Sequence, residues 1–140
     1  MNSNDRNLEL IKKAEMLTIS GKLQWYRLRK FILSHPENKS LKLKIVSENG
    51  YYTHNNETRI DELGSFCAKF ESGVIAVFRY PCAKSDQYYT LALQANEDGK
   101  VLEITSKCDF QHELKKLIYY IEQSSDNFDS FIEKFINYEG

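Results

Sequence analysis

The chain has 140 residues, of which 41% are hydrophobic and 28% are charged, and its formal net charge is −1. These totals predict one globular domain over residues 1–140 and exclude an intrinsically disordered chain. The near-zero charge argues against bulk binding of nucleic acid or anionic membranes, and no apolar run approaches the roughly 20 residues that span a bilayer.

The first predicted element is a helix from Asp5 to Ile19. Asn4 or Asp5 can cap its N-terminus, and Gly21 stands where a C-terminal glycine is expected. Its apolar positions recur at helical spacing: Leu10, Ile11, Ala14 and Leu17.

The segment GKLQWYRLRKF, residues 21–31, holds the only tryptophan of the chain. Leu23 and Trp25 alternate as in a strand, whereas Leu28, Phe31 and Ile32 follow helical spacing. We therefore predict a short extended piece that leads into a helical turn. A loop is expected at residues 34–40, because Pro36 lacks a backbone donor.

From there the hydrophobic period changes to two. Residues 41–46, LKLKIV, are predicted to form a strand with its apolar residues on one face and its lysines on the other. Asn49-Gly50 is a strong hairpin signal, and a loop follows at residues 55–64. Four further strands are predicted at residues 65–70, 74–80, 87–94 and 101–105. Residues 74–80 are apolar on both faces, which favours a central strand in an antiparallel meander of about five strands.

Two helices are predicted at the C-terminal end. Ser106 or Asp109 can cap the first, whose apolar face is Phe110, Leu114, Leu117, Ile118 and Ile121. Asp126 or Asn127 can cap the second, whose apolar stripe is Phe128, Phe131, Ile132, Phe135 and Ile136. The expected fold class is α+β, with the helices packed on one face of the antiparallel sheet.

Signals of an active site are missing from the sequence. It has no glycine-rich phosphate loop, and its 3 His and 3 Cys do not have the spacing of metal ligands. Cys108 comes nearest to a nucleophile, because it precedes a helix and His112 lies four residues on, but a small residue at a helix start is the simpler interpretation. We predict no enzymatic activity, no metal and no cofactor.

The cysteine count and the first residues bear on location. An odd number of widely spaced cysteines favours reduced thiols in a cytoplasm. The stretch MNSNDRNLEL shows no basic region followed by an apolar one, so no secretory signal is expected.

Charge is distributed unevenly along the chain. Residues 22–44 contain seven basic residues and only Glu37 as an acid: Lys22, Arg27, Arg29, Lys30, Lys39, Lys42 and Lys44. Interleaved with Trp25, Tyr26 and Phe31, they suit a protein-binding hot spot or a surface that grips single-stranded nucleic acid. The third interpretation is a core segment whose basic side chains stay in water. We expect Trp25 to be mostly buried as an anchor, with Arg27, Arg29 and Lys30 displayed around it.

Adjacent tyrosine pairs are a second feature. Neighbouring strand residues face opposite sides of a sheet, so Tyr52 and Tyr88 are predicted on an uncovered sheet face. Exposed tyrosines there would serve recognition, whereas cross-strand aromatic packing would stabilise the sheet without a partner.

The stretch AEMLTISGKLQWYRL, Ala14 to Leu28, resembles the start of small uncharacterised proteins from phages and mobile elements of low-GC Gram-positive bacteria. In those proteins a helix ends in a Thr-x-x-Gly-Lys-Leu-type turn that leads to a tryptophan. The resemblance implies a cytoplasmic accessory protein that acts by stoichiometric binding, for example as an inhibitor of a host or defence factor. It defines no catalytic or binding residues.

The sequence therefore predicts a non-enzymatic domain that binds another protein and acts by steric occlusion. The candidate contact residues are Trp25, Tyr26, Arg27, Arg29 and Lys30, with Tyr52 and Tyr88 as a second set. Binding of nucleic acid through the basic residues 22–44 is the leading alternative. Sequestration of a small ligand such as a nucleotide between sheet and helices is the other.

Overall fold

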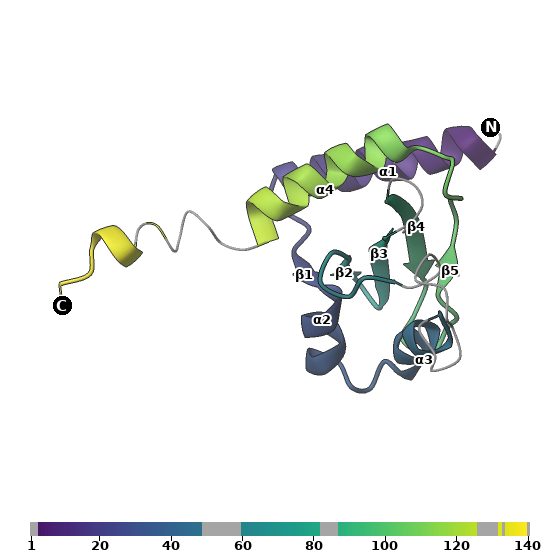
Figure 1. The fold of residues 1–140 in the computed structure, drawn as a ribbon, viewed down its shortest axis with the longest axis horizontal. Helices are drawn as coiled ribbons and strands as arrows, with labels where there is room; N and C mark the ends of the chain where they lie inside the picture. The colour runs from purple at the N-terminus through teal and green to yellow at the C-terminus, as the bar shows by residue number, and fades with distance from the viewer. Residues whose placement is uncertain (1–2, 49–59, 82–86, 126–131, 133, 140) are drawn as a thin grey trace.

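Five strands form one antiparallel sheet in the order β1-β2-β3-β4-β5 (Figure 1). The computed structural model describes residues 3–48, 60–81, 87–125, 132 and 134–139. The strands are β1 (Trp25–Arg27), β2 (Phe66–Phe70), β3 (Gly73–Tyr80), β4 (Tyr88–Gln94) and β5 (Leu102–Glu103). The helices are α1 (Ser3–Ile19), α2 (Leu28–Ser34), α3 (Lys39–Glu48) and α4 (Gln111–Ser125). The α+β class is confirmed, as are the N-terminal helix, the central position of β3 and the helix that follows the sheet.

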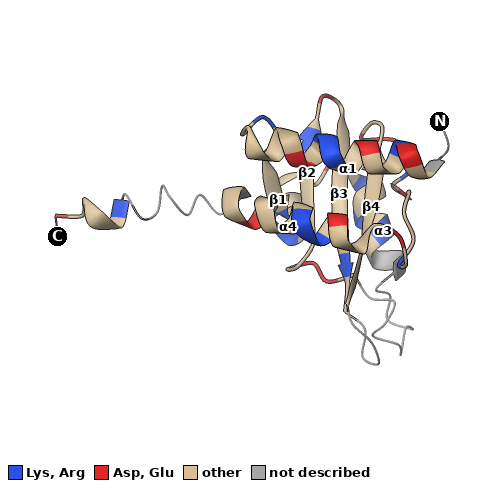
Figure 2. Ribbon diagram, turned by 90° about the horizontal axis from the view of Figure 1, so that it is seen from above, with Lys and Arg blue, Asp and Glu red and all other residues tan. Residues whose placement is uncertain are grey.

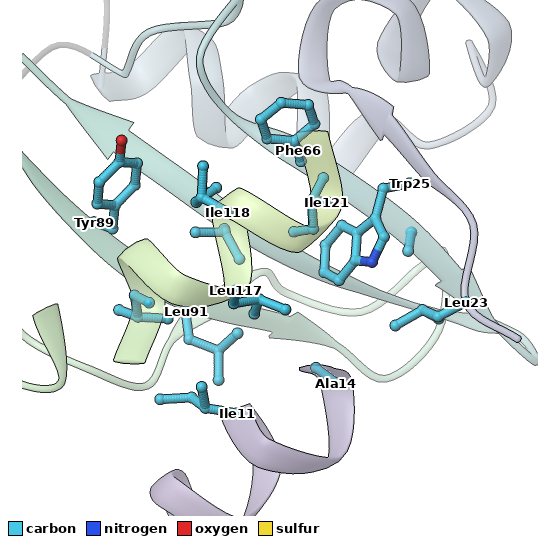
Figure 3. Packing of buried hydrophobic residues seen from close by; sticks show 13 residues of the cluster. Ile11, Ala14, Leu23, Trp25, Phe66, Tyr89, Leu91, Leu117, Ile118 and Ile121 are labelled. Carbon is cyan, nitrogen blue, oxygen red and sulfur yellow. The ribbon is translucent and has the colours of Figure 1, made fainter. Parts of the chain in front are cut away.

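Helices α1 and α4 lie side by side on one face of the sheet (Figures 1 and 2). The first hydrophobic cluster fills the space between them and the strands, as Figure 3 shows. Its members come from both helices and from the sheet: Ile11 and Ala14 of α1, Trp25, Phe66 and Leu91 of the sheet, and Leu114, Leu117 and Ile121 of α4, among others. Gly21, with φ +74°, ends the turn after α1, as its sequence position predicts.

Helices α2 and α3 cover the opposite face (Figure 1), so the domain has three layers. A second cluster lies there, formed by Leu28 and Phe31 of α2, Leu41 and Ile45 of α3, Ile60, and inward residues of the sheet such as Cys67, Ala76 and Phe78. The expectation of helices on one face alone is therefore wrong. Strand β3 is apolar on both sides, so each side needs a layer that removes it from water.

The predicted strand at residues 41–46 is helical instead, as part of α3. Leu41 and Ile45 are buried one turn apart, whereas Leu43 is 66% exposed. Asn38 begins the helix, because its Oδ1 accepts from the Leu41 backbone N–H at 3.2 Å. The loop predicted at 34–40 is accordingly shorter, because Ser34 ends α2 and Lys39 begins α3.

The edges of the sheet also differ from expectation. The first strand is β1, whose extended piece and following helical turn were predicted, and it pairs with β2 through Trp25–Ala68 and Tyr26–Cys67. The last strand, β5, is only two residues long, and Leu102 in it is 60% exposed.

Several predictions fall partly or wholly outside the described residues. The Asn49-Gly50 hairpin lies entirely outside them. Of the second C-terminal helix, residues 132 and 134–136 are helical, which agrees with the prediction. The described residues of its predicted apolar stripe, Ile132, Phe135 and Ile136, are 38%, 74% and 71% exposed, so this part of the helix does not pack on the sheet.

Candidate functional site

Trp25 belongs to the core and not to a contact surface. Its side chain is 1% exposed, and its indole Nε1 donates to Thr18 Oγ1 at 2.8 Å. The expected burial is confirmed, and the same burial removes Trp25 from the candidate contact residues. Phe31, the other aromatic residue with which it was grouped, is buried against the opposite face of the sheet.

Arg27 makes more contacts within the protein than the sequence predicts. It is half-buried, its Nη1 donates to the Leu63 carbonyl oxygen at 2.5 Å, and its guanidinium carbon lies 5.2 Å from the Phe66 ring centroid. Tyr26 is half-buried too, with Lys30 Nζ 5.7 Å from its ring centroid. Tyr26 and Lys30 are therefore more available for contact with a binding partner than Arg27 is.

The outer side of α2 displays Arg29, Lys30 and Leu33. All three are exposed, and Leu33 is 75% exposed. Because positions three and four apart are neighbours on a helix, Leu33 lies beside both basic side chains. This face is turned outward because Leu28 and Phe31 occupy the inner one.

Helix α3 repeats the arrangement. Lys39, Lys42 and Leu43 are exposed, and Leu43 follows Lys39 by one turn. We call the six residues together the basic–leucine surface: Arg29, Lys30, Leu33, Lys39, Lys42 and Leu43. Both helices belong to the layer on the same sheet face, and no acidic residue occurs in α2 or at positions 39–47.

The opposite layer has a different electrostatic character. Figure 2 shows acidic and basic residues interspersed along α1 and α4. Lys116 Nζ, for example, lies 3.4 Å from Glu15 Oε1 across the two helices. The uneven charge of the sequence therefore becomes a difference between the two helical layers.

The sequence predicts Tyr52 and Tyr88 on an uncovered sheet face, and for Tyr88 this is wrong. Tyr52 lies outside the described residues. Tyr88 is half-buried, and its ring stacks on Tyr80 with centroids 4.8 Å apart. The face that carries Tyr80 is the one covered by α2 and α3, so Tyr88 is part of a stacked aromatic pair at its margin.

Leu33 and Leu43 are the surface residues that sequence reasoning missed. Leu33 is out of phase with the apolar positions of α2, which is a usable signal of exposure. The strand predicted at residues 41–46 places Leu43 on the same face as Leu41 and Ile45. Recognising Asn38 as a helix cap would have placed Leu43 opposite Leu41 and Ile45.

Titratable groups in the described part of the chain do not assemble into a metal site. No group of three or more His, Cys, Asp or Glu side chains there is placed to hold a metal ion. Burial raises the pKa of the Cys67 thiol far above its ordinary value, whereas Cys108 is exposed. Within the described ranges, no helix is both long and apolar enough to cross a membrane.

Comparison with known proteins identifies no relative of this chain. No protein-family model, curated protein or solved structure matches the chain.

Proposed function

We propose that this domain is a non-enzymatic binding protein that uses the basic–leucine surface to hold an acidic, partly apolar segment of another protein. The observation that carries the proposal is the pair of exposed leucines, Leu33 and Leu43, each one helical turn after a basic residue. Burying a leucine side chain contributes about 2 kcal/mol, and the surrounding positive charges select an acidic partner.

A protein partner fits this surface better than a nucleic acid. Single-stranded nucleic acid binds by stacking successive bases on exposed aromatic rings, but Trp25 and Phe31 are buried and Tyr26 is only half-exposed. The phosphate backbone also gains nothing from two leucines. Nucleic-acid binding through residues 22–44 remains the alternative, supported by the five basic residues there that are exposed: Lys22, Arg29, Lys30, Lys39 and Lys42.

The finer form of the proposal is an inhibitor that occludes a surface of a host or defence factor. It is supported by the resemblance of residues 14–28 to phage-type accessory proteins, which act by stoichiometric binding. An inhibitor of this kind requires a stable domain with one binding surface and requires no catalytic group.

The test is affinity capture from bacterial lysate with and without nuclease, using the wild type and two double variants. Leu33→Ser with Leu43→Ser removes both exposed leucines of the surface. Leu63→Ser with Leu102→Ser is the matched control, because these leucines are 58% and 60% exposed outside α2 and α3.

We expect one nuclease-resistant protein that the first variant loses and the control retains, and Arg29→Glu should weaken its capture. Circular dichroism should show all variants folded. A partner that disappears on nuclease treatment, or whose affinity falls steeply with salt and ignores the leucines, would instead favour nucleic-acid binding.

A further inference from the structure

A cavity of about 400 Å³ lies on the α2 side of the sheet, where β1 begins and β2 ends. Its wall includes Lys22, Gln24, Tyr26, Ser34, His35 and Lys69. The volume falls in the range of sites that hold small molecules. None of these residues belongs to the basic–leucine surface, so the cavity is a separate feature of the molecule.

Strand register explains why these side chains meet. Tyr26 pairs with Cys67 and Trp25 with Ala68, and the next step in the same register brings Gln24 beside Lys69. Alternate residues share a face, so Gln24, Tyr26 and Lys69 all point to the α2 side, as Cys67 does. The end of α2 then adds Ser34 and His35 as the opposite wall.

The charged residues that line the cavity are basic. Lys22 and Lys69 both line it, and no carboxylate is among the described residues of its wall. Lys69 Nζ lies 3.0 Å from Glu97 Oε1, and the two side chains are 40% and 35% exposed. Exposed ion pairs contribute little to stability, so Lys69 can exchange Glu97 for an anionic ligand at low cost.

His35 is held in a defined orientation. Its Nδ1 lies 3.0 Å from the Phe31 carbonyl oxygen, which can only accept, so Nδ1 carries a proton. The ring also stacks on Phe31, with centroids 4.2 Å apart and an interplanar angle of 24°. These contacts fix the imidazole and leave Nε2 for a ligand.

Tyr26 gives the wall a flat aromatic component. Its ring is half-buried and lies close to Lys30 Nζ, 5.7 Å from the centroid. Aromatic rings bind planar heterocycles by stacking. Polar groups that can fix the edge of such a heterocycle or a sugar hydroxyl are the Gln24 amide and the Ser34 hydroxyl.

We infer that this cavity binds a mononucleotide. The phosphate lies against Lys22 and Lys69, the base stacks on Tyr26, and His35 with Ser34 closes the site from α2. The combination of two ammonium groups, an aromatic wall and neutral hydrogen-bonding side chains matches a phosphate joined to a planar base. A bare anion would use the lysines alone.

The test is isothermal titration calorimetry of the full chain with AMP, GMP, CMP and UMP, and with adenosine and inorganic phosphate as fragments. We expect at least one mononucleotide to bind with a Kd below about 1 mM, and each fragment at least ~10-fold more weakly. Affinity should decrease as salt is raised, because the phosphate contributes through charge. No binding by any of the four nucleotides, or phosphate binding as tightly as they do, would overturn the inference.

Variants locate the site. Lys22→Ala with Lys69→Ala should weaken nucleotide binding by at least ~10-fold, and Tyr26→Ala should weaken it while Tyr26→Phe does not. Lys13→Ala with Lys115→Ala is the control, because it removes the same charge from exposed positions on α1 and α4. Equal losses in both lysine pairs would refute the cavity as the site. The Leu33→Ser, Leu43→Ser variant should keep nucleotide affinity, which separates this inference from the proposed protein-binding function.

Discussion

Trp25 is joined to Thr18 by a buried hydrogen bond of 2.8 Å, and Thr18 Oγ1 in turn donates to the Ala14 carbonyl oxygen at 2.6 Å. These two consecutive hydrogen bonds, which we call the relay, connect the edge strand β1 to the last turns of α1. One hydroxyl therefore both satisfies the indole N–H and links the sheet to its helical layer. The tryptophan that dominates the sequence has a structural role with an identifiable partner.

Replacing Thr18 by valine should destabilise the domain by about 1–3 kcal/mol, because the buried indole N–H would lose its acceptor. Chemical denaturation followed by tryptophan fluorescence measures this directly, since Trp25 is the only tryptophan. Thr18→Ser should retain most of the stability, because it keeps the hydroxyl. Ser20→Ala is the control, because that hydroxyl is exposed. Equal stability of Thr18→Val and wild type would contradict the relay.

Glu103 connects β5 to α3. Its Oε2 lies 3.0 Å from Lys44 Nζ, and its Oε1 accepts from Thr90 Oγ1 at 2.7 Å and from the Tyr80 hydroxyl. Burial alone would raise the pKa of Glu103, but the hydrogen bonds from Tyr80, Thr90 and Lys44, together with the charge of Lys44, bring the pKa below its ordinary value.

This lowered pKa predicts acid sensitivity. The unfolded chain takes up its proton first, near pH 4.3, so the stability contributed by ionised Glu103 is fully present above that pH. It is lost as the pH falls through the lower pKa of the folded state. Glu103→Gln should unfold more easily at pH 7 and lose less stability than wild type on acidification. Denaturation midpoints measured from about pH 7 to pH 3 test this.

Glu9→Gln, on the exposed side of α1, is the matched control for charge. We expect its acid profile to follow that of the wild type. If Glu103→Gln also followed the wild-type profile, the ionised carboxylate would not be contributing to stability.

Asn38 and Gln94 form a reciprocal pair of buried side-chain amides. Asn38 Nδ2 donates to Gln94 Oε1 at 2.8 Å, and Gln94 Nε2 donates to Asn38 Oδ1 at 3.0 Å. The same Oδ1 caps α3 through the Leu41 N–H. The start of α3 is thereby fixed against β4, 56 residues away in the chain.

Asn38→Ala should cost on the order of 2 kcal/mol, because it removes a helix cap and leaves buried groups of Gln94 with fewer partners. Asn38→Asp keeps the cap acceptor but cannot donate to Gln94 Oε1, so its stability should fall between those of Asn38→Ala and wild type. Thermal denaturation by circular dichroism measures both. A larger loss for the aspartate than for the alanine would mean that the cap contributes less than the burial of charge costs.

The same pair shows why part of the fold could not be predicted. The alternation of Leu41, Leu43 and Ile45 fits a strand. The helix is favoured by the cap at Asn38, whose partner Gln94 lies far away in the sequence. The strands 66–70, 73–80 and 88–94 were predictable because their apolar pattern is local and bounded by turns. The second helical layer was not, because it depends on what the far side of β3 contacts.

The candidate surface was predictable to a similar extent. Arg29 and Lys30 are exposed as expected, because charged side chains remain in water wherever the chain folds. Trp25 is buried, as expected, but its hydrogen-bond partner Thr18 and its place in the core beneath α4 could not be predicted from its neighbours in the sequence. The cavity beside Tyr26 combines residues 22 and 69, whose proximity follows only from the pairing of β1 with β2.

The two described cysteines should differ sharply in reactivity. Cys67 is fully buried in the second core cluster, and burial raises the pKa of its thiol, whereas Cys108 is exposed before α4. Because the thiolate is the reactive form, we expect iodoacetamide to modify Cys108 in the native protein and to leave Cys67 unmodified. Peptide mass spectrometry reads each site separately. In denaturant both should react at similar rates, which serves as the internal control. Native modification of Cys67 as fast as Cys108 would show that the layer of α2 and α3 opens readily, and would also weaken the case for a rigid basic–leucine surface on it.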